Sequence, residues 1–167
     1  MRAFVVSFAL TLAAAAAEAQ QATAEPPSAA MKTFASSSDV TELIAKAKSD
    51  RKDGQPMVSE PILRLAPYNV NLEYRTAAAP AAVHERDAEL FYVIDGSGTM
   101  VTGGKLAGEK RTNADNLSGT SIEGGASRRV AKGDFVIVPE NTPHQIVAVD
   151  GTLVLMTFHV PRPLLGH

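Results

Sequence analysis

The sequence predicts an all-β domain, a sandwich or a barrel, carried behind a short helix. From Met57 onward, short runs rich in β-branched and aromatic residues are separated by turns that contain glycine, proline or asparagine. No alternation of strands with helices is visible, so parallel βαβ units are not expected. No internal repeat of roughly 20–50 residues is visible either, so a solenoid is not expected.

The composition limits the classes of function. The 167 residues are 45% hydrophobic, which fits one globular domain plus additional segments. They include no cysteine, which excludes disulfides, thiolate catalysis and thiolate metal ligands. The formal charge of −2 lacks the basic excess that nucleic-acid binding needs. We therefore expect a small diffusible molecule as the partner and no nucleic acid.

The N-terminal residues 1–19 are predicted to be a signal peptide. Arg2 precedes the apolar run "AFVVSFALTLAAAAA", and an Ala-x-Ala cleavage site ends at Ala19. The run is shorter than the roughly 20 apolar residues of a membrane span. We expect cleavage near Ala19 and a mature periplasmic or secreted protein without a membrane span. Residues 20–37, small, polar and proline-bearing, are expected to form a flexible leader.

Residues 38–56 are predicted to form a helical extension and a linker. Asp39 is expected to cap the helix, with Glu42 three positions further on. "SDRKDGQP" then ends the helix. Its apolar stripe consists of Val40, Leu43, Ile44 and Ala47.

Residues 57–160 are predicted to form the β-domain, and residues 161–167 a C-terminal tail. In "YNVNLEYRT", Val70, Leu72 and Tyr74 alternate with polar residues. "ELFYVIDGSGTMVTGG" is expected to give two strands around a Gly-Ser-Gly turn. Residues 127–160 are expected to give three or four more strands. The segment 103–127 has little apolar periodicity, and we expect a long loop that is anchored by Leu117 and Ile122.

Three polar residues at strand ends suggest a metal site. In "VHERDAELFYVIDG", a turn at Arg86-Asp87 allows His84 and Glu89 to face the same interior. His144 opens the strand after the turn "PENTP". Two imidazoles and one carboxylate form the facial set typical of non-haem Fe(II), and the set also suits Zn, Ni or Mn. The alternative is a metal-free barrel in which these side chains pair with one another.

These stretches resemble the two motifs of the cupin superfamily, which are small jelly-roll β-barrels. His84, Glu89 and Gly96 match the second histidine, the glutamate and the closing glycine of the first motif. The second motif is matched by Gly133, Pro139 and His144. Ala82 stands at the first histidine position, and Asn141 stands at a motif glycine. The resemblance covers roughly residues 57–160 and implies a single jelly-roll domain, one divalent metal ion and a homodimer.

Other residues are placed by strand alternation and by the loops that carry them. Phe91 and Ile137 are expected to line the barrel interior, as core or as pocket wall, and Tyr92 is expected to face away from it. In the segment 109–116, Lys110, Arg111 or Asn113 would contact substrate, or the loop is simply solvated. Glu85 is expected to point outward with Arg86. His159 is expected at an edge or on the surface, with a substitute fourth metal ligand as the alternative.

The sequence thus predicts an exported, metal-binding cupin that acts on a small organic molecule. The chemistry would be dioxygenase-like with iron, or isomerase-like or lyase-like with an ion that acts as a Lewis acid. The alternative is a barrel that binds or senses a small ligand without turnover. No catalytic acid or base is identified, and no Gly-x-Ser-x-Gly nucleophile elbow is present.

Overall fold

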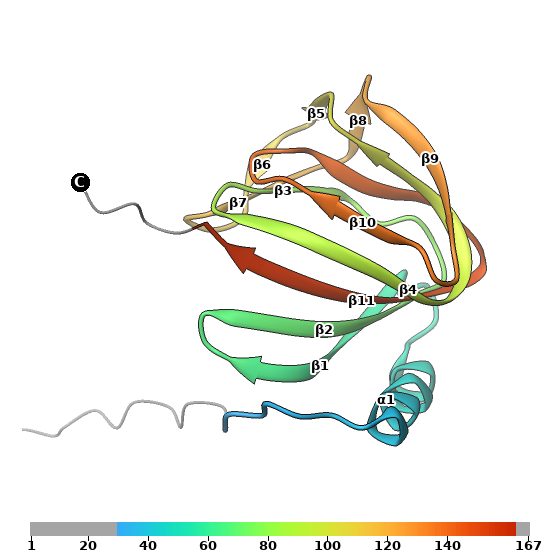
Figure 1. Cartoon of the computed structure of the whole chain (residues 1–167). Helices are drawn as coiled ribbons and strands as arrows, with labels where there is room; N and C mark the ends of the chain where they lie inside the picture. The colour runs from blue at the N-terminus through green and yellow to red at the C-terminus, as the bar shows by residue number, and fades with distance from the viewer. Residues whose placement is uncertain (1–29, 163–167) are drawn as a thin grey trace, which may run out of the picture.

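The computed structural model describes residues 30–162 and shows a jelly-roll β-barrel with one helix against its outside (Figure 1). The predicted fold class is confirmed. The predicted signal peptide and most of the predicted leader and tail lie outside the described residues. The elements are α1 (Ser37–Asp50), β1 (Met57–Leu65), β2 (Tyr68–Arg75), β3 (Ala81–His84), β4 (Asp87–Thr102), β5 (Lys105–Ala107), β6 (Lys110–Arg111), β7 (Asn116–Gly119), β8 (Ser121–Glu123), β9 (Ala126–Ala131), β10 (Phe135–Val138) and β11 (His144–Pro161).

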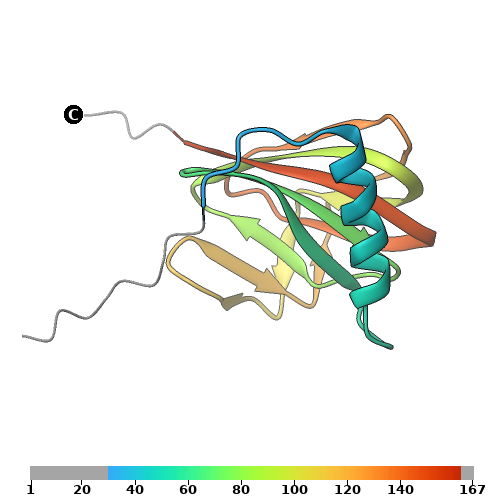
Figure 2. The same cartoon turned by 90° about the horizontal axis from the view of Figure 1, so that it is seen from below.

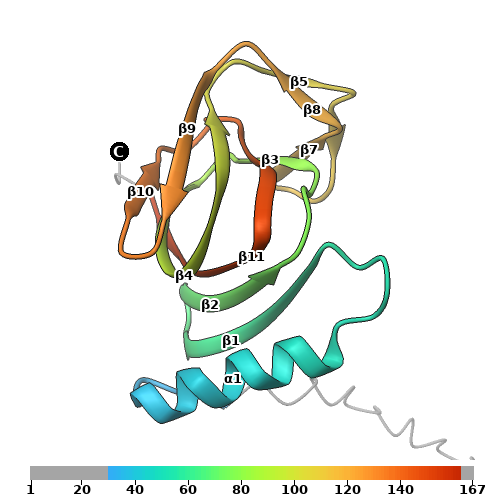
Figure 3. The ribbon, with the colours of Figure 1, turned by 90° about the vertical axis from the view of Figure 1, so that its right-hand side faces the viewer.

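Two long strands, β4 and β11, take part in both layers of the barrel (Figure 3). In layer 1, the first half of β4 pairs with β10 and with the second half of β11, and β2 and β1 extend the sheet. In layer 2, the second half of β4 pairs with β9 and with the first half of β11, and β3, β7 and β6 extend the sheet. Both strands fold over at the same end of the barrel.

The corner between the layers depends on Gly96. The pairing of β4 with β11 shifts register between Val149 and Leu153, where the strands turn from one layer to the other. Gly96 has φ 79°, and a Cβ atom there would collide with the carbonyl oxygen of Thr152. Only glycine allows the two backbones to approach this closely. The two strands predicted around Gly-Ser-Gly are therefore halves of one bent strand.

The space between the layers is filled by a buried apolar cluster. On β4, Phe91 and Val93 share the inward face with Glu89, as the sequence predicted, because strand side chains alternate between faces. Tyr92 faces the other way and its ring lies against that of exposed Phe135, with centroids 4.6 Å apart. The cluster consists of Phe91, Val93, Met100, Val130, Val136, Val138, Ile146, Leu153 and Leu155.

Helix α1 lies across the outer face of β1 and β2 (Figure 2). Its predicted stripe of Val40, Leu43, Ile44 and Ala47 packs on a second apolar cluster that includes fully buried Leu72. The predicted cap is wrong by three residues. Ser36 is the N-cap and Asp39 is the third helical residue, and each side chain bonds the other's backbone N–H. Ser36 has the extended backbone that an N-cap requires.

The segment 103–127 is not the long anchored loop that the sequence predicted. It contains four short strands, of which β5 and β8 form a separate two-stranded sheet. The other two, β7 and β6, add to the free edge of β3 and widen layer 2. These strands are held by pairing at a sheet edge rather than by burial of both faces, so they show little apolar alternation. Among residues 30–162, no helix is both long and apolar enough to cross a membrane.

Candidate metal centre

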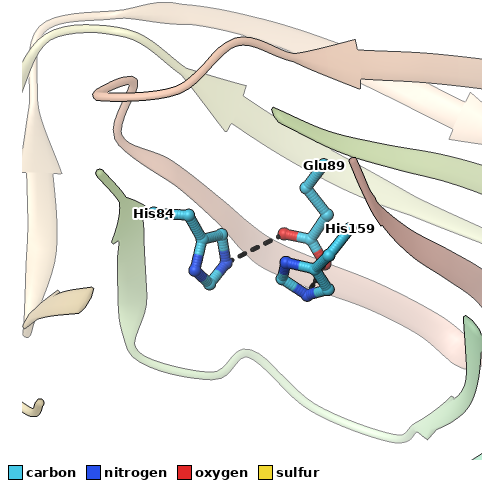
Figure 4. A group of neighbouring side chains, drawn as sticks. All are labelled: His84, Glu89 and His159. Carbon is cyan, nitrogen blue, oxygen red and sulfur yellow. Dashed lines mark hydrogen bonds and ion pairs between the residues drawn. The ribbon is translucent and has the colours of Figure 1, made fainter. Parts of the chain in front are cut away.

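Four side chains from both layers meet at the barrel end opposite the Gly96 corner. His84 ends β3 and His144 begins β11, both in layer 2. Glu89 lies in the first half of β4 and is directly paired with His159 of β11, both in layer 1. Because β11 folds over between the layers, its two histidines reach the same place from opposite sides. We call these four residues the His/Glu cluster; Figure 4 shows three of them directed toward one another.

The turn before His144 is fixed to the end of β3. Asn141 has φ 59°, the left-handed conformation that asparagine tolerates better than most residues. Its N–H donates to the carbonyl oxygen of His84, at 2.8 Å. Asparagine thus serves at the position where the resembling motif has glycine, and the turn sets His144 beside His84. Their ring centroids are 5.2 Å apart.

Glu89 is the centre of the cluster. Its side chain is 6% exposed, against 9% for His144, 18% for His84 and 21% for His159. The Nε2 atoms of His84 and His144 lie 3.1 and 3.0 Å from Glu89 Oε2. His159 Nε2 lies 3.5 Å from Oε1. All three imidazoles therefore present the same nitrogen to one buried carboxylate.

The other ring nitrogen of each histidine faces an oxygen acceptor. His84 Nδ1 donates to Asn116 Oδ1 at 2.6 Å, and His144 Nδ1 donates to the carbonyl oxygen of Thr142 at 3.3 Å. His159 Nδ1 lies 3.7 Å from the carboxylate of Asp87. An acceptor at Nδ1 holds the proton there and leaves the Nε2 lone pair free for a ligand.

The electrostatics of the cluster fit a cation. Burial by itself raises the pKa of Glu89, but hydrogen bonds from His144 and His84 outweigh burial and bring this pKa well below its ordinary value. Burial lowers the pKa of His84, and hydrogen bonds with Glu89 and Asn116 outweigh it, so that this pKa is raised. When Nδ1 holds the only proton of an imidazole, the lone pair on Nε2 faces the carboxylate of Glu89. Two electron-rich atoms at this distance repel each other, so either a second proton on the imidazole or a metal ion must lie between them.

The residues present fit one divalent ion. Donor atoms of His84, Glu89 and His159 all lie within 4.8 Å of one another, and His144 contacts the same carboxylate. Imidazole and carboxylate donors suit iron, nickel, manganese and zinc. Oxygen acceptors at Nδ1 commonly accompany metal-bound histidine, because they fix the position of the proton and the orientation of the ring.

The structure brings together the predicted ligands His84, Glu89 and His144 and adds a residue expected elsewhere. His159 is not at a surface edge, because it lies opposite Glu89 in the register of β11 with β4. The inward alternation of Leu155, Thr157 and His159 was the available signal. Asn116 was missed, since its contact with His84 depends on the pairing of β7 with β3.

The two hydrophobic pocket residues have different outcomes. Phe91 is buried and its ring centroid lies 5.7 Å from that of His144, beside the cluster. Ile137 was expected inside but is 63% exposed on the outer face of β10. Its neighbours Val136 and Val138 take the inward positions because β10 pairs with β4 in the register that places Val138 opposite Glu89.

Two of the residues predicted to contact substrate, Arg111 and Asn113, are engaged away from the cluster. Arg111 makes a bidentate ion pair with Glu85, at 2.7 and 2.9 Å, on the outer face of β3 and β7. Asn113 is exposed and its side chain accepts from the N–H of Asp115. Glu85 points outward as expected, but its partner is Arg111, while Arg86 pairs with Asp115.

Comparison with known proteins agrees with this architecture. A family model described as Cupin matches residues 60–163. The DMSP lyase DddQ from Ruegeria pomeroyi DSS-3 is 15% identical with a TM-score of 0.51, over 82% of this chain and 68% of that one. TT1209 from Thermus thermophilus is 17% identical with a TM-score of 0.49, over 70% of this chain and 93% of that one. The cupin domain of Schizosaccharomyces pombe Cnp3 is 13% identical with a TM-score of 0.48, over 68% of this chain and 71% of that one. No curated protein matches the sequence. Likeness at these identities is one of fold.

Proposed function

The chain belongs to the cupin family, and we propose that it is a metal-dependent enzyme that acts on a small organic molecule at the His/Glu cluster. One observation carries the proposal. Three histidine Nε2 atoms converge on one buried carboxylate while each Nδ1 faces an oxygen acceptor. A core that only needed to satisfy its polar groups would not require three imidazoles in the same orientation.

The protein's own contribution is to hold and orient. Glu89 supplies a negative charge in a nearly buried position, and the hydrogen bond from His84 to Asn116 keeps the ring of His84 turned toward it. The carboxylate of Asp87 lies 3.7 Å from His159 Nδ1. A bound divalent ion would supply Lewis acidity, or, as iron, a redox centre for oxygen chemistry. Four protein donors are fewer than the six of an octahedral ion, which leaves room for substrate. The identity of the metal decides between the isomerase-like or lyase-like reaction and the dioxygenase-like one.

A non-catalytic binding or sensing barrel is the second candidate, and one observation favours it. Among the described residues, the titratable side chains that line the cluster are its own members and Asp87, which contacts His159. None of them is left over to act as a separate acid or base. A sensing barrel would release its bound small molecule chemically unchanged, whereas an enzyme would convert it. Mass spectrometry of a co-purified molecule before and after incubation distinguishes the two.

Metal content tests the proposal directly. The full chain, purified without a metal-binding tag or chelator, is analysed for iron, nickel, zinc and manganese beside two matched variants. Glu89→Gln removes the central carboxylate, and Glu85→Gln removes an outward carboxylate four positions away. We expect near-stoichiometric metal in the wild type and in Glu85→Gln and little in Glu89→Gln. Equal metal in the two variants, or none in any form after anaerobic loading with Fe(II), would refute the metal centre.

We further propose export and a homodimer. Export is supported by the composition of residues 1–19, and the measurement is N-terminal sequencing of the protein from the periplasm or medium of an expressing bacterium, with a mature end near Gln20 expected. Homodimerisation is supported by membership of the cupin family, and light scattering after gel filtration would measure it. An uncleaved chain in the cytoplasm would refute the proposed export. A monomer in light scattering would refute the proposed homodimer.

A further inference from the structure

One row of directly paired residues runs from the His/Glu cluster to the edge of layer 2. His144 of β11 is paired with Ala82 of β3, Ala82 with Ser118 of β7, and Ser118 with Lys110 of β6. Residues directly opposite each other in an antiparallel pair present their side chains on the same face. The neighbouring pair, His84 with Asn116, has its side chains in contact at the cluster. Because alternate residues of a strand share a face, Ala82 and Ser118 face the cluster as well.

Lys110 and Arg111 are neighbours in sequence and therefore lie on opposite faces of layer 2. Arg111 is paired with Leu117 on the outer face and is occupied by Glu85. Lys110 is paired with Ser118 on the face that carries the cluster, and it is exposed. The edge strand β6 thus places one ammonium group on the side from which a small molecule would approach the metal.

Ala82 leaves space within this row. Its methyl group stands between His144 and Ser118 and is partly exposed to solvent, as is Ser118. The third nitrogen donor of the cluster comes instead from His159, in layer 1. The face of the cluster toward β3 and β7 consequently carries a methyl group and a hydroxyl group where a bulky ligand side chain would block access.

Charge and length indicate what would lie along the row. A divalent ion together with Glu89 leaves one net positive charge. The second carboxylate near the cluster, Asp87, faces the Nδ1 atom of His159 in layer 1, so an anionic oxygen donor is favoured on the layer 2 side. Lys110 adds a second positive charge three strands away from His144. At the usual strand spacing of about 4.8 Å, the Cα atoms of His144 and Lys110 are about 14 Å apart. The side chains of His144 and Lys110 can shorten the gap between the ion and the ammonium group to the length of a small organic molecule. Ser118 offers a hydroxyl group between the two charges.

We propose that the substrate of the cluster is a small organic acid with two anionic ends, one bound at the metal beside Ala82 and the other by the ammonium group of Lys110. The proposal rests on the proposed metal-dependent function, because one end requires the ion. It assigns Lys110 to substrate selection, Ser118 to substrate binding and Ala82 to access.

The test uses the full chain loaded with Co(II), whose visible spectrum reports ligand binding at the ion independently of any turnover. Succinate is titrated as a probe with two carboxylates, and butyrate as a probe of the same length with one. We expect succinate to bind about tenfold more tightly, the usual effect of one partly screened charge-assisted hydrogen bond. Lys110→Met should reduce succinate affinity to that of butyrate, whereas Lys105→Met, at an exposed position of β5, should leave the preference unchanged.

Two further variants test the position of the ligand. Ala82→Leu should keep cobalt and lose the spectral response to both probes, and Ser118→Val should weaken both without loss of cobalt. Ala126→Leu lies in the same row on the other side of His144, beyond Thr102, and should bind both probes normally. Equal affinity for the two probes, an unchanged preference in Lys110→Met, or blockage by Ala126→Leu instead of Ala82→Leu would overturn the proposal. If the wild type does not take up cobalt, both the metal centre and the present proposal are refuted. The cobalt content is measured before any probe is added, so this failure is distinguished from a failure of probe binding.

Discussion

Asn116→Leu should weaken metal binding although Asn116 is not itself a ligand. Asn116 Oδ1 accepts from His84 Nδ1 at 2.6 Å, and the side chain of His84 is only 18% exposed. Leucine has a similar size and no acceptor, so the proton is free to move to Nε2, the nitrogen that must bind the ion. Loss of such a partner typically lowers metal affinity about 10–100-fold. This factor corresponds to about 1.4–2.7 kcal/mol.

The same loss should be visible in thermal stability. An ion that binds only the folded chain stabilises it by mass action, so a weaker ion stabilises it less. At saturating metal, a loss of about 1.4–2.7 kcal/mol lowers the melting temperature by about 3–10 °C in a domain of this size. The assays are a competition titration with a chromophoric zinc chelator and a melting curve with and without zinc.

Three comparisons make the result interpretable. Asn116→Asp keeps an acceptor at the same place and should retain or strengthen metal binding. Asn113→Leu, three positions upstream and exposed, should behave as the wild type. In metal-free protein, Asn116→Leu should lose less stability than it loses with zinc. If Asn116→Leu binds zinc as tightly as Asn113→Leu does, the orienting role of Asn116 is wrong.

Further predictions concern the fourth donor, the pH dependence and the helix. His159→Ala should lower the metal content measured by elemental analysis. Full metal content in this variant would show that His159 is not a metal ligand. In metal-free protein, the raised pKa of His84 gives stability that is complete below its unfolded value of 6.5 and is lost as the pH rises through the folded value. The lowered pKa of Glu89 gives stability that is lost in acid. With zinc, the sign near neutrality should reverse, because the ion competes with protons, and melting curves across neutral pH would show it. Leu72→Ala, fully buried beneath α1, should cost about 2–5 kcal/mol in urea unfolding, and a loss below about 1 kcal/mol would contradict the packing of α1 on the barrel.

The parts of the site that could be predicted from sequence are those whose geometry is local. His84 and Glu89 are joined by a tight turn, and His144 follows a turn, so their spacing along the chain nearly determines their positions. The helix stripe was predictable for the same reason, since residues three and four apart share a helix face. The cap was misplaced because both Ser36 and Asp39 are good N-cap residues and only the backbone conformation of Ser36 decides between them.

The parts that could not be predicted depend on the pairing of distant strands. Ile137 lies in "FVIV", where either alternation is apolar, so the inward face is set by the register of β10 with β4. The orienting role of Asn116 and the opposite faces of Lys110 and Arg111 depend on the pairing of β6 and β7 at the edge of layer 2. No periodicity within 103–127 carries this information, because these strands are specified by the edge they join.

In the proposed metal site the fourth donor is His159 in layer 1, because position 82 in layer 2 is an alanine, and this affects how the two layers are connected. The His/Glu cluster takes two members from each layer, His84 and His144 from layer 2 and Glu89 and His159 from layer 1. At the opposite end, the layers are joined by the continuous backbones of β4 and β11; at the cluster end, they are joined by the turn from β3 to β4 and the turn from β10 to β11, and the side chains of the cluster face each other between these turns. The chain has no cysteine, so no disulfide can join the layers there. A bound ion would add a cross-link between them, which would couple occupancy of the site to the packing of this end of the barrel.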